Sequence, residues 1–197
     1  MPDVDEVLAL AGGRSGHFLL ESGSHADLWL DLESLLIRPR LLRPLAAELG
    51  RRLAAHGVEV VCGPLTGGAF LAQHVADELD ATFVYAERRV TPAGAVFRVP
   101  TGMREAVRGR RVALVDDAIS AGSAVGGALV DVRACGGVPA AIGALLVVAE
   151  GAERLAAASA LPLERLADRP IGLWEPAACP LCAAGVPLHD LTGAGAG

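Results

Sequence analysis

The chain of 197 residues contains no lysine, and all 17 of its basic residues are arginines. Arginine stays protonated across the physiological pH range, so it can neutralise a phosphate but cannot serve as a general acid. Acid–base chemistry by a lysine is therefore excluded. The 23 acidic residues outnumber the arginines, which gives a formal net charge of −6. This balance argues against a broad nucleic-acid-binding surface.

Aromatic residues, cysteines and long apolar runs are also scarce. Only 4% of the residues are aromatic, so alanine, valine and leucine must fill the core that a hydrophobic content of 52% allows. No apolar run reaches about 18 residues and no basic region precedes one near the start, so neither a membrane span nor a signal peptide is expected. Four cysteines in a chain of this length do not make a disulfide scaffold. We therefore predict a cytoplasmic enzyme with reduced thiols, folded as one domain.

The segment Val112–Ala124, with the sequence VALVDDAISAGSA, has the most informative pattern. Its first four residues are an unbroken apolar run, typical of a strand buried on both faces of a parallel sheet. The carboxylates of Asp116 and Asp117 follow, then the loop Ser120–Ser123, then a helix pattern. The amides of such a loop and a helix N-terminus can bind phosphate, while the acids suit sugar hydroxyls. The pattern favours a sugar-phosphate site over a turn in which the acids only cap the helix.

A second strand, glycine-rich loop and helix come earlier in the chain. The strand is expected at 58–62, the loop at Gly63–Gly68 and the helix from about Ala69 to Leu79. Hydrophobic periodicity indicates further helices at 3–10, 39–56 and 153–158, and further strands at 17–20, 28–30, 82–86 and 139–148. Alternating strands and helices predict an α/β fold with a mostly parallel sheet, whose ligands bind at the carboxyl ends of the strands. Both loops would then lie along one rim, where one can hold pyrophosphate and the other a 5-phosphate.

Arginines gather in the stretch between residues 87 and 109, which glycines and prolines interrupt. We expect a β-ribbon or a mobile flap there. Its candidates to close over an anionic substrate are Arg88, Arg89, Arg98 and Arg104. Surface arginines are usually solvated and without such a role, and we expect this of at least two of the four.

A Cys-x-x-Cys pair, Cys179 and Cys182, lies near the end of the chain. One such pair is half of a tetrahedral zinc site. His189 is a possible third ligand, and no second cysteine pair is evident. A redox role for the pair is an alternative. Structural thiols in a folded-back tail are a third interpretation.

From Gly16 to about Leu188 the chain resembles the type I phosphoribosyltransferases, and among them the orotate phosphoribosyltransferases. The resemblance is carried by the signature for phosphoribosyl pyrophosphate (PRPP) at 112–124 and by the segments GHFLLESGSH, CGPLTGG, YAERR and CPLCxxGxPL. It implies an α/β type I phosphoribosyltransferase fold, in which helices flank a mostly parallel central sheet that carries a small hood. The single domain would have its core at about 38–150, and its hood at about 14–37 together with a C-terminal segment at 160–190.

The resemblance also implies an activity, the transfer of the phosphoribosyl group from PRPP to orotate with Mg²⁺ as cofactor. The products would be orotidine 5′-monophosphate and pyrophosphate, in pyrimidine nucleotide biosynthesis. The catalytic residues implied are Asp116 and Asp117, which would face the ribose hydroxyls, and Arg88 and Arg89, which would supply cations, often to the other subunit of a homodimer. The PRPP-binding residues implied are Leu65, Thr66, Gly67, Ser120, Ala121, Gly122, Ser123 and Ala124. The base would lie under Ser22, Gly23 and Trp29. Mg²⁺ would be held largely by substrate oxygens, so no protein metal ligands are assigned.

Two features depart from the family pattern. Members usually carry lysines in the mobile loop and often in the hood, whereas this chain has none and Ser24 stands where a lysine is common. After the late strand, members commonly have Asp-Arg near the orotate, whereas this chain has Val148-Ala149-Glu150, without a cation for the orotate carboxylate. Three hypotheses therefore stay open: orotate transfer with arginines in place of lysines, transfer to another base or acceptor, and a non-catalytic PRPP-binding regulatory protein.

Overall fold

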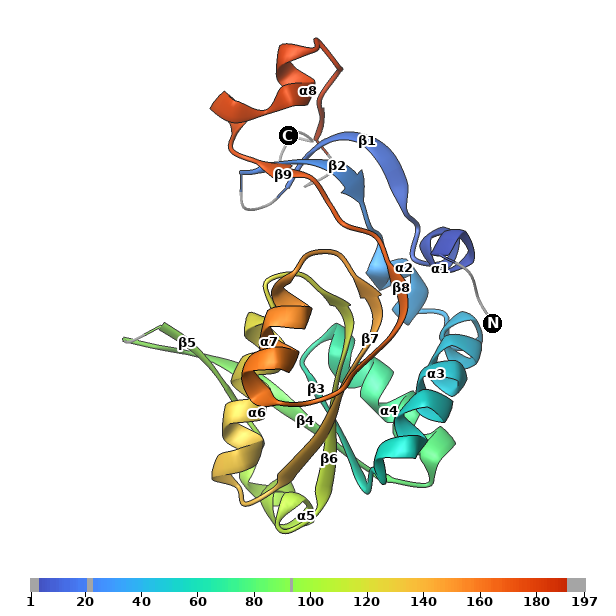
Figure 1. Ribbon diagram of the computed structural model, residues 1–197, viewed down its shortest axis with the longest axis vertical. Helices are drawn as coiled ribbons and strands as arrows, with labels where there is room; N and C mark the ends of the chain where they lie inside the picture. Colours follow the sequence, from blue (N-terminus) through green and yellow to red (C-terminus); the bar gives the residue numbers. More distant parts are fainter. Residues whose placement is uncertain (1–3, 21–22, 93, 191–197) are drawn as a thin grey trace.

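The computed structural model describes residues 4–20, 23–92 and 94–190, which form a large core sheet and a smaller sheet above it (Figure 1). In spatial order the core sheet contains β5 (Gly94–Arg98), β4 (Thr82–Thr91), β3 (Val60–Pro64), β6 (Arg111–Ile119), β7 (Val138–Val147) and β8 (Leu163–Asp168). The small sheet contains β10 (His189–Asp190), β1 (Arg14–Leu19), β2 (His25–Trp29) and β9 (Leu173–Trp174). Neighbouring strands of the core sheet are parallel except β4 and β5. The predicted α/β fold with a mostly parallel sheet is confirmed.

The helices follow the expected periodic segments closely. Those around the core are α2 (Leu32–Leu36), α3 (Pro39–Leu53), η1 (Ala54–His56), α4 (Gly67–Leu79), η2 (Thr101–Met103), α5 (Arg104–Val107), α6 (Ser123–Ala134) and α7 (Gly151–Ser159). The first described element is α1 (Val4–Leu10), and the C-terminal segment forms η3 (Pro176–Ala178) and α8 (Pro180–Ala183). We call the small sheet together with η3 and α8 the hood. Among the described residues, no helix is both long and apolar enough to cross a membrane.

The core has three layers because its central strand is apolar on both faces. Ala113 and Val115 of β6 pack into a cluster with leucines of α3 and α4, and Val112 and Leu114 pack into a second cluster with α6 and α7. Alternation along a strand sends successive side chains to opposite faces, so the four apolar residues supply both clusters. Figure 1 shows α3 and α4 on one side of the sheet and α6 and α7 on the other. The interpretation of 112–115 as a doubly buried strand is therefore confirmed.

The strand β6 is longer than its apolar run predicts. It continues through the two acids to Ile119, because β7 keeps pairing with it from Asp116 opposite Ala144 to Ile119 opposite Val147. On its other edge the pairing with β3 ends at Cys62 opposite Leu114. The two strands thus stop pairing just before the acids, at the carboxyl ends where open α/β sheets bind ligands.

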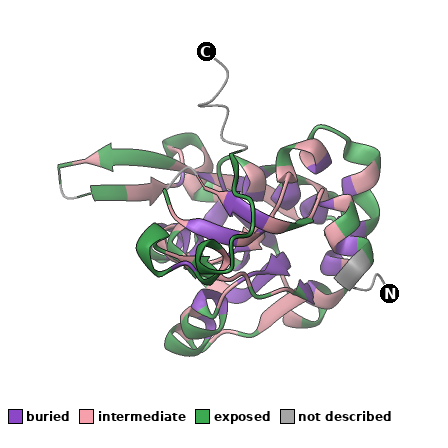
Figure 2. Cartoon of the chain, turned by 90° about the horizontal axis from the view of Figure 1, so that it is seen from above, coloured by how far each residue is buried: buried purple, intermediate pink, exposed green. Residues whose placement is uncertain are grey.

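The C-terminal segment leaves the core later than the sequence suggests. Residues 163–168 form β8, which pairs in parallel with β7 from Ile142 opposite Leu163 to Val147 opposite Asp168. The segment therefore joins the hood after Asp168 and not near residue 160, because β7 offers a free edge with which an extended segment can pair. The expected β-ribbon is present as β4 and β5, and it projects from the body with mostly exposed residues near its tip (Figure 2).

Candidate active site

The two glycine-rich loops meet at the acidic pair. A Cβ added at Gly68 would lie 2.5 Å from Oδ1 of Asp116, and one added at Gly67 would overlap Oδ2 of Asp117. A Cβ at Gly63 would in turn overlap the carbonyl oxygen of Gly68. Only glycine allows such close approach of a backbone to a carboxylate or to another backbone. The loop after β3 is thus packed directly onto the two acids at the end of β6.

Burial and mutual repulsion shape the charge of the acidic pair. Burial raises the pKa of Asp116 well above its ordinary value, and the charge of Asp117 raises it further. Burial also raises the pKa of Asp117, although a hydrogen bond that the amide of Ala118 donates to Oδ1 over 2.8 Å works in the opposite direction. Both shifts disfavour the ionised pair, and hydrogen-bond donors or a cation bound beside the carboxylates would offset this cost.

The loop after the acids forms a small cup at the start of α6. Residues 116 and 118–125 line a cavity of about 270 Å³. Gly122 has a φ of +76°, which lets the chain turn into the helix, and its carbonyl accepts a hydrogen bond from the amide of Gly126 over 2.8 Å. A Cβ at Gly151 would overlap the carbonyl oxygen of Ser120, so the N-terminus of α7 supports the cup from behind. A phosphate in this cup would meet loop amides, serine hydroxyls and the positive end of a 12-residue helix.

The loop after β3 lines a second cavity on the other side of the acids. Its volume is about 240 Å³, and its lining includes Glu33, Thr66, Gly67, Phe70 and Asp117. The peptide bond between residues 65 and 66 is cis, and the amide of residue 65 donates to the carbonyl of Ala86 over 2.9 Å. Thr66 and Gly67 thus lie beside Asp117 at the start of α4, whereas Leu65 is bonded through its amide to β4.

The sequence places Gly68 in the second glycine-rich loop without an individual role, and it does not point to Glu33 at all. The negative charge of Glu33 raises the pKa of Asp117, so this carboxylate comes close enough to act on the pair. Nothing in the local sequence around Glu33 signals this proximity, because α2 reaches the site through tertiary packing. Gly68 could have been included from the double glycine that follows Thr66.

The four candidate arginines divide into two pairs. Arg98 forms an ion pair of 2.7 Å with the buried Asp131 of α6, and Arg104 lies 3.6 Å from the same carboxylate. Those two therefore hold the base of the ribbon against α6. Arg88 and Arg89 are exposed on β4, where Arg89 pairs with Glu87 over 2.7 Å. They stay available to an anion that approaches the ribbon.

The candidate base-binding residues lie at the two ends of β2. Gly23 forms the turn before β2, and its amide donates to the carbonyl of Leu20 over 2.8 Å. Trp29 ends the strand nearer the core and packs against Phe18, with ring centroids 6.3 Å apart. The extended chain from His25 to Trp29 alone spans roughly 13 Å, so Gly23 and Trp29 lie at opposite ends of the strand. Ser22 lies outside the described residues.

Comparison with known proteins defines the class of this fold and site. The family model of the phosphoribosyl transferase domain matches residues 31–159, which include both loops, the acidic pair and the ribbon. This chain belongs to the phosphoribosyltransferase family, which makes it a transferase of the glycosyltransferase type. Within that family, several sequence relatives are named orotate phosphoribosyltransferase.

Two of these relatives cover nearly the whole chain. The orotate phosphoribosyltransferase of Caldanaerobacter subterraneus subsp. tengcongensis is 31% identical over 89% of this chain and 87% of that protein. The orotate phosphoribosyltransferase of Thermus thermophilus is also 31% identical, over 96% of this chain and 100% of that protein. Among solved structures, the orotate phosphoribosyltransferase of Aeropyrum pernix superposes with a TM-score of 0.67 at 22% identity, covering 84% of this chain and 93% of that one. This last likeness concerns the fold alone.

Proposed function

We propose that this chain transfers the phosphoribosyl group of PRPP to orotate, giving orotidine 5′-monophosphate and pyrophosphate, as a cytoplasmic homodimer that uses Mg²⁺. The observation that carries the proposal is the contact of Gly67 and Gly68 with the carboxylates of Asp117 and Asp116. This contact brings a loop suited to pyrophosphate and a cup suited to a 5-phosphate to opposite sides of one acidic pair. PRPP carries both anionic groups on one ribose, so a single molecule can occupy both loops.

The acidic pair suits the ribose between those two anionic groups. Ribose hydroxyls are donors, and Asp116 and Asp117 offer carboxylate oxygens to accept them. Both carboxylates also offer the hard oxygen ligands that suit a nearby Mg²⁺. A cation favours their ionised form and so offsets the rise in their pKa that burial causes. Mg²⁺, held by PRPP oxygens next to these two residues, would neutralise charge on the departing pyrophosphate.

The chain's own groups would stabilise the separation of charge in the transfer. As pyrophosphate leaves the anomeric carbon, negative charge would grow beside the loop after β3, where the amides of Thr66 and Gly67 can face it, whereas the amide of Leu65 is bonded to Ala86. Arg88 and Arg89 of the ribbon would add positive charge, and a ribbon that projects from its own body suits delivery to the site of a second copy. Arginine serves this role without lysine, because stabilising a phosphate needs charge and not proton transfer.

Orotate is the acceptor that the names of the relatives favour, and these relatives match 89% and 96% of this chain. One observation favours a second candidate, a base without a carboxylate. At the end of β7 the residues Val148, Ala149 and Glu150 offer no cation, and Glu150 is itself paired with Arg154 over 3.1 Å. An anionic base would gain nothing from this part of the rim.

A substrate panel separates the candidates. We expect the full-length protein with PRPP and Mg²⁺ to consume orotate and release an equal amount of pyrophosphate, followed by ultraviolet absorbance and by a coupled pyrophosphate assay. Uracil, adenine, guanine and hypoxanthine are the comparison acceptors. Turnover with one of these and none with orotate would replace the proposed acceptor. Binding of PRPP without turnover of any acceptor would instead support the regulatory alternative.

A further inference from the structure

Two histidines of the hood meet the two cysteines of the C-terminal segment. The ligand atoms of His17, His25, Cys179 and Cys182 all lie within 4.8 Å of one another. His17 and His25 belong to one hairpin: Leu19 pairs with His25, and His17 lies two residues before Leu19. The register of the hairpin shifts between Ser15 and Phe18, and Nε2 of His17 there lies 3.0 Å from Nδ1 of His25. The sequence separation of 162 residues between His17 and Cys179 is bridged only by folding.

The spacing of these atoms matches a tetrahedral zinc site. Zn–S bonds of about 2.3 Å and Zn–N bonds of about 2.0–2.1 Å place sulfur and nitrogen ligands about 3.6 Å apart, and two nitrogens about 3.3 Å apart. In the protein, Nε2 of His17 lies 3.4 Å from Sγ of Cys179 and 3.7 Å from Sγ of Cys182. Nδ1 of His25 lies 3.3 Å from Sγ of Cys182 and 3.0 Å from Nε2 of His17.

The second nitrogen of His17 is already held in the way a metal-binding histidine requires. Its Nδ1–H donates to the carbonyl oxygen of Val186 over 2.9 Å. This bond leaves the proton on Nδ1 and the lone pair of Nε2 directed at the cysteines. Outer hydrogen bonds of this kind fix the tautomer and ring orientation of zinc-bound histidines.

Burial indicates that the cluster takes the place of an apolar core. His17, His25 and Cys179 are each at most 5% exposed. Every other residue of the described stretch 171–190 is at least partly exposed, so Cys179 is the one buried residue there. The strands β9 and β10 that join this stretch to the hood have two residues each. A small unit with so little apolar burial usually needs a disulfide or a metal to stay folded.

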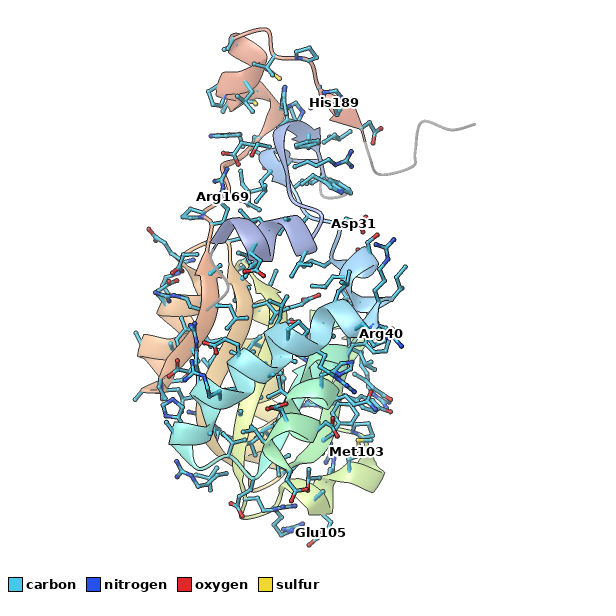
Figure 3. All side chains as sticks on the ribbon, turned by 90° about the vertical axis from the view of Figure 1, so that its right-hand side faces the viewer. Asp31, Arg40, Met103, Glu105, Arg169 and His189 are labelled. Atoms are coloured by element: carbon cyan, nitrogen blue, oxygen red, sulfur yellow. The ribbon has the colours of Figure 1, made fainter. Side chains whose placement is uncertain are left out.

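We propose that His17, His25, Cys179 and Cys182 bind one Zn²⁺ ion, which fastens the C-terminal segment to the hairpin of β1 and β2. A set of two thiolates and two imidazoles in tetrahedral arrangement selects zinc over magnesium or calcium. All four positions are filled by protein groups, so the site is structural and separate from the Asp116–Asp117 site. His189 is not part of the cluster: it lies on β10 and packs against Phe18, with ring centroids 5.9 Å apart (Figure 3).

Metal content tests the proposal directly. The full-length protein, purified under reducing conditions from medium containing zinc, should hold one zinc per chain by elemental analysis and by native mass spectrometry. Replacing zinc with Co²⁺ should give the visible bands and the thiolate-to-cobalt charge-transfer band of a tetrahedral site. The Cys182→Ser and Cys179→Ser variants should each lose at least nine-tenths of the bound metal.

Matched control variants and a folding measurement distinguish a specific loss of zinc from a general loss of the folded structure. His189→Gln removes a histidine of the same segment, and Cys135→Ser removes a thiol of the core, and both should retain one zinc per chain. Circular dichroism checks that the Cys182→Ser variant keeps its core. Chelation of zinc should increase hydrogen exchange at 173–190 while the exchange of β6 and β7 stays constant.

Three results would overturn the proposal. The first is a protein that binds no zinc or cobalt when either ion is supplied in excess under reducing conditions. The second is metal binding that survives in the double variant Cys179→Ser/Cys182→Ser. The third is a disulfide between Cys179 and Cys182 in the freshly purified protein, found as an intact mass about 2 Da below the reduced mass. Each readout is independent of turnover, so the zinc site and the proposed transferase activity can fail separately.

Discussion

Gly67 lies against the carboxylate of Asp117 so closely that no side chain fits between them. The glycine begins α4, which follows β3, and the acid lies near the end of β6, so the contact joins the start of a helix to the strand beside β3. It fixes the distance between a row of loop amides and the pair of carboxylates. Precise spacing of this kind matters for catalysis, because a shift of about 1 Å can cost about 100-fold in rate.

The Gly67→Ala variant should therefore lose activity more than stability. The added methyl would overlap Oδ2 of Asp117 and displace either the loop or the carboxylate. We expect kcat/KM for PRPP to fall by about 10- to 100-fold. Gly102→Ala is the matched control, because a Cβ there meets no atom within 4 Å and its activity should stay unchanged. Equal activity of the two variants in steady-state assays would show that the contact is not needed.

Replacing both acids by asparagine should abolish turnover and stabilise the unliganded protein. Because burial raises the pKa of Asp116 and Asp117, the folded state holds their protons more tightly than the unfolded chain does. The cost of ionising them in the folded state is therefore absent below their ordinary pKa and grows as the pH rises above it. The Asp116→Asn/Asp117→Asn variant escapes this cost, and each 1 kcal/mol gained should raise Tm by about 2–4 °C.

Thermal melts at several pH values check this sign. The variant's advantage in Tm should be present at pH 7 and shrink as the pH is lowered toward 4. Added PRPP and Mg²⁺ should raise the Tm of the wild type and leave that of the variant unchanged. Turnover equal to that of the wild type would refute the assigned role of the acids, and an advantage independent of pH would refute its electrostatic cause.

If the ribbon serves the site of a second subunit, two inactive variants should restore each other. Arg88→Ala/Arg89→Ala removes the exposed cations of β4, and Asp116→Asn/Asp117→Asn removes the acids. After unfolding and refolding an equal mixture, half of the dimers are mixed and each mixed dimer holds one complete site. Activity should then return to about a quarter of the wild-type value.

The control for this mixture is each variant refolded alone, which should stay inactive. If the arginines act within their own subunit, the mixture also stays inactive, because no subunit then holds a complete set of groups. Size-exclusion chromatography with light scattering gives the oligomeric state in the same samples. A monomer at assay concentration would contradict the proposed exchange between subunits.

The buried Asp131 should be important for stability. Its carboxylate accepts hydrogen bonds from Nη1 of Arg98 and from the amide of Val99, each over 2.7 Å. Asp131→Ala would leave that buried amide without a partner, which costs about 1–3 kcal/mol. Arg98 and Arg104 are 42% and 44% exposed and keep their hydration, so the loss should stay below the cost of breaking a fully buried pair.

Chemical denaturation measures this loss as a change in the free energy of unfolding. Glu150→Ala is a suitable comparison, because its ion pair with Arg154 is exposed and should contribute less than about 0.5 kcal/mol. Relative to the wild type, the Asp131→Ala substitution should also increase the rate of hydrogen exchange in β5 more than in β7. A free energy of unfolding equal to that of Glu150→Ala would contradict the anchoring role of Asp131.

Local patterns predicted much of the fold and of the phosphate-binding loops. The apolar run Val112–Val115 marks a strand buried on both faces, and the alternation of strands and helices marks a mostly parallel sheet. The two loops follow because parallel strands carry them to the same rim. These inferences succeed because hydrophobic periodicity and turn residues are local features, each contained in a few consecutive residues of the sequence.

Pairing along sheet edges was harder to predict. The continuation of β6 through the acids depends on β7 beside it, and residues 163–168 join the core only because β7 has a free edge. Glu33 reaches the acids through the packing of α2, a short helix without a motif of its own. Each of these features depends on which elements become neighbours.

The sequence by itself determined the class of fold, the acidic pair and the two loops, because each of these is encoded in a short contiguous segment. Only the tertiary structure decided that Gly67 and Gly68 touch the acids and that Arg98 and Arg104 are anchored by Asp131. It alone brought His17 and His25 to Cys179 and Cys182. The physical reason is that side-chain contacts between distant segments are set by how the sheets, helices and hood pack together, and no periodicity along the chain records that packing.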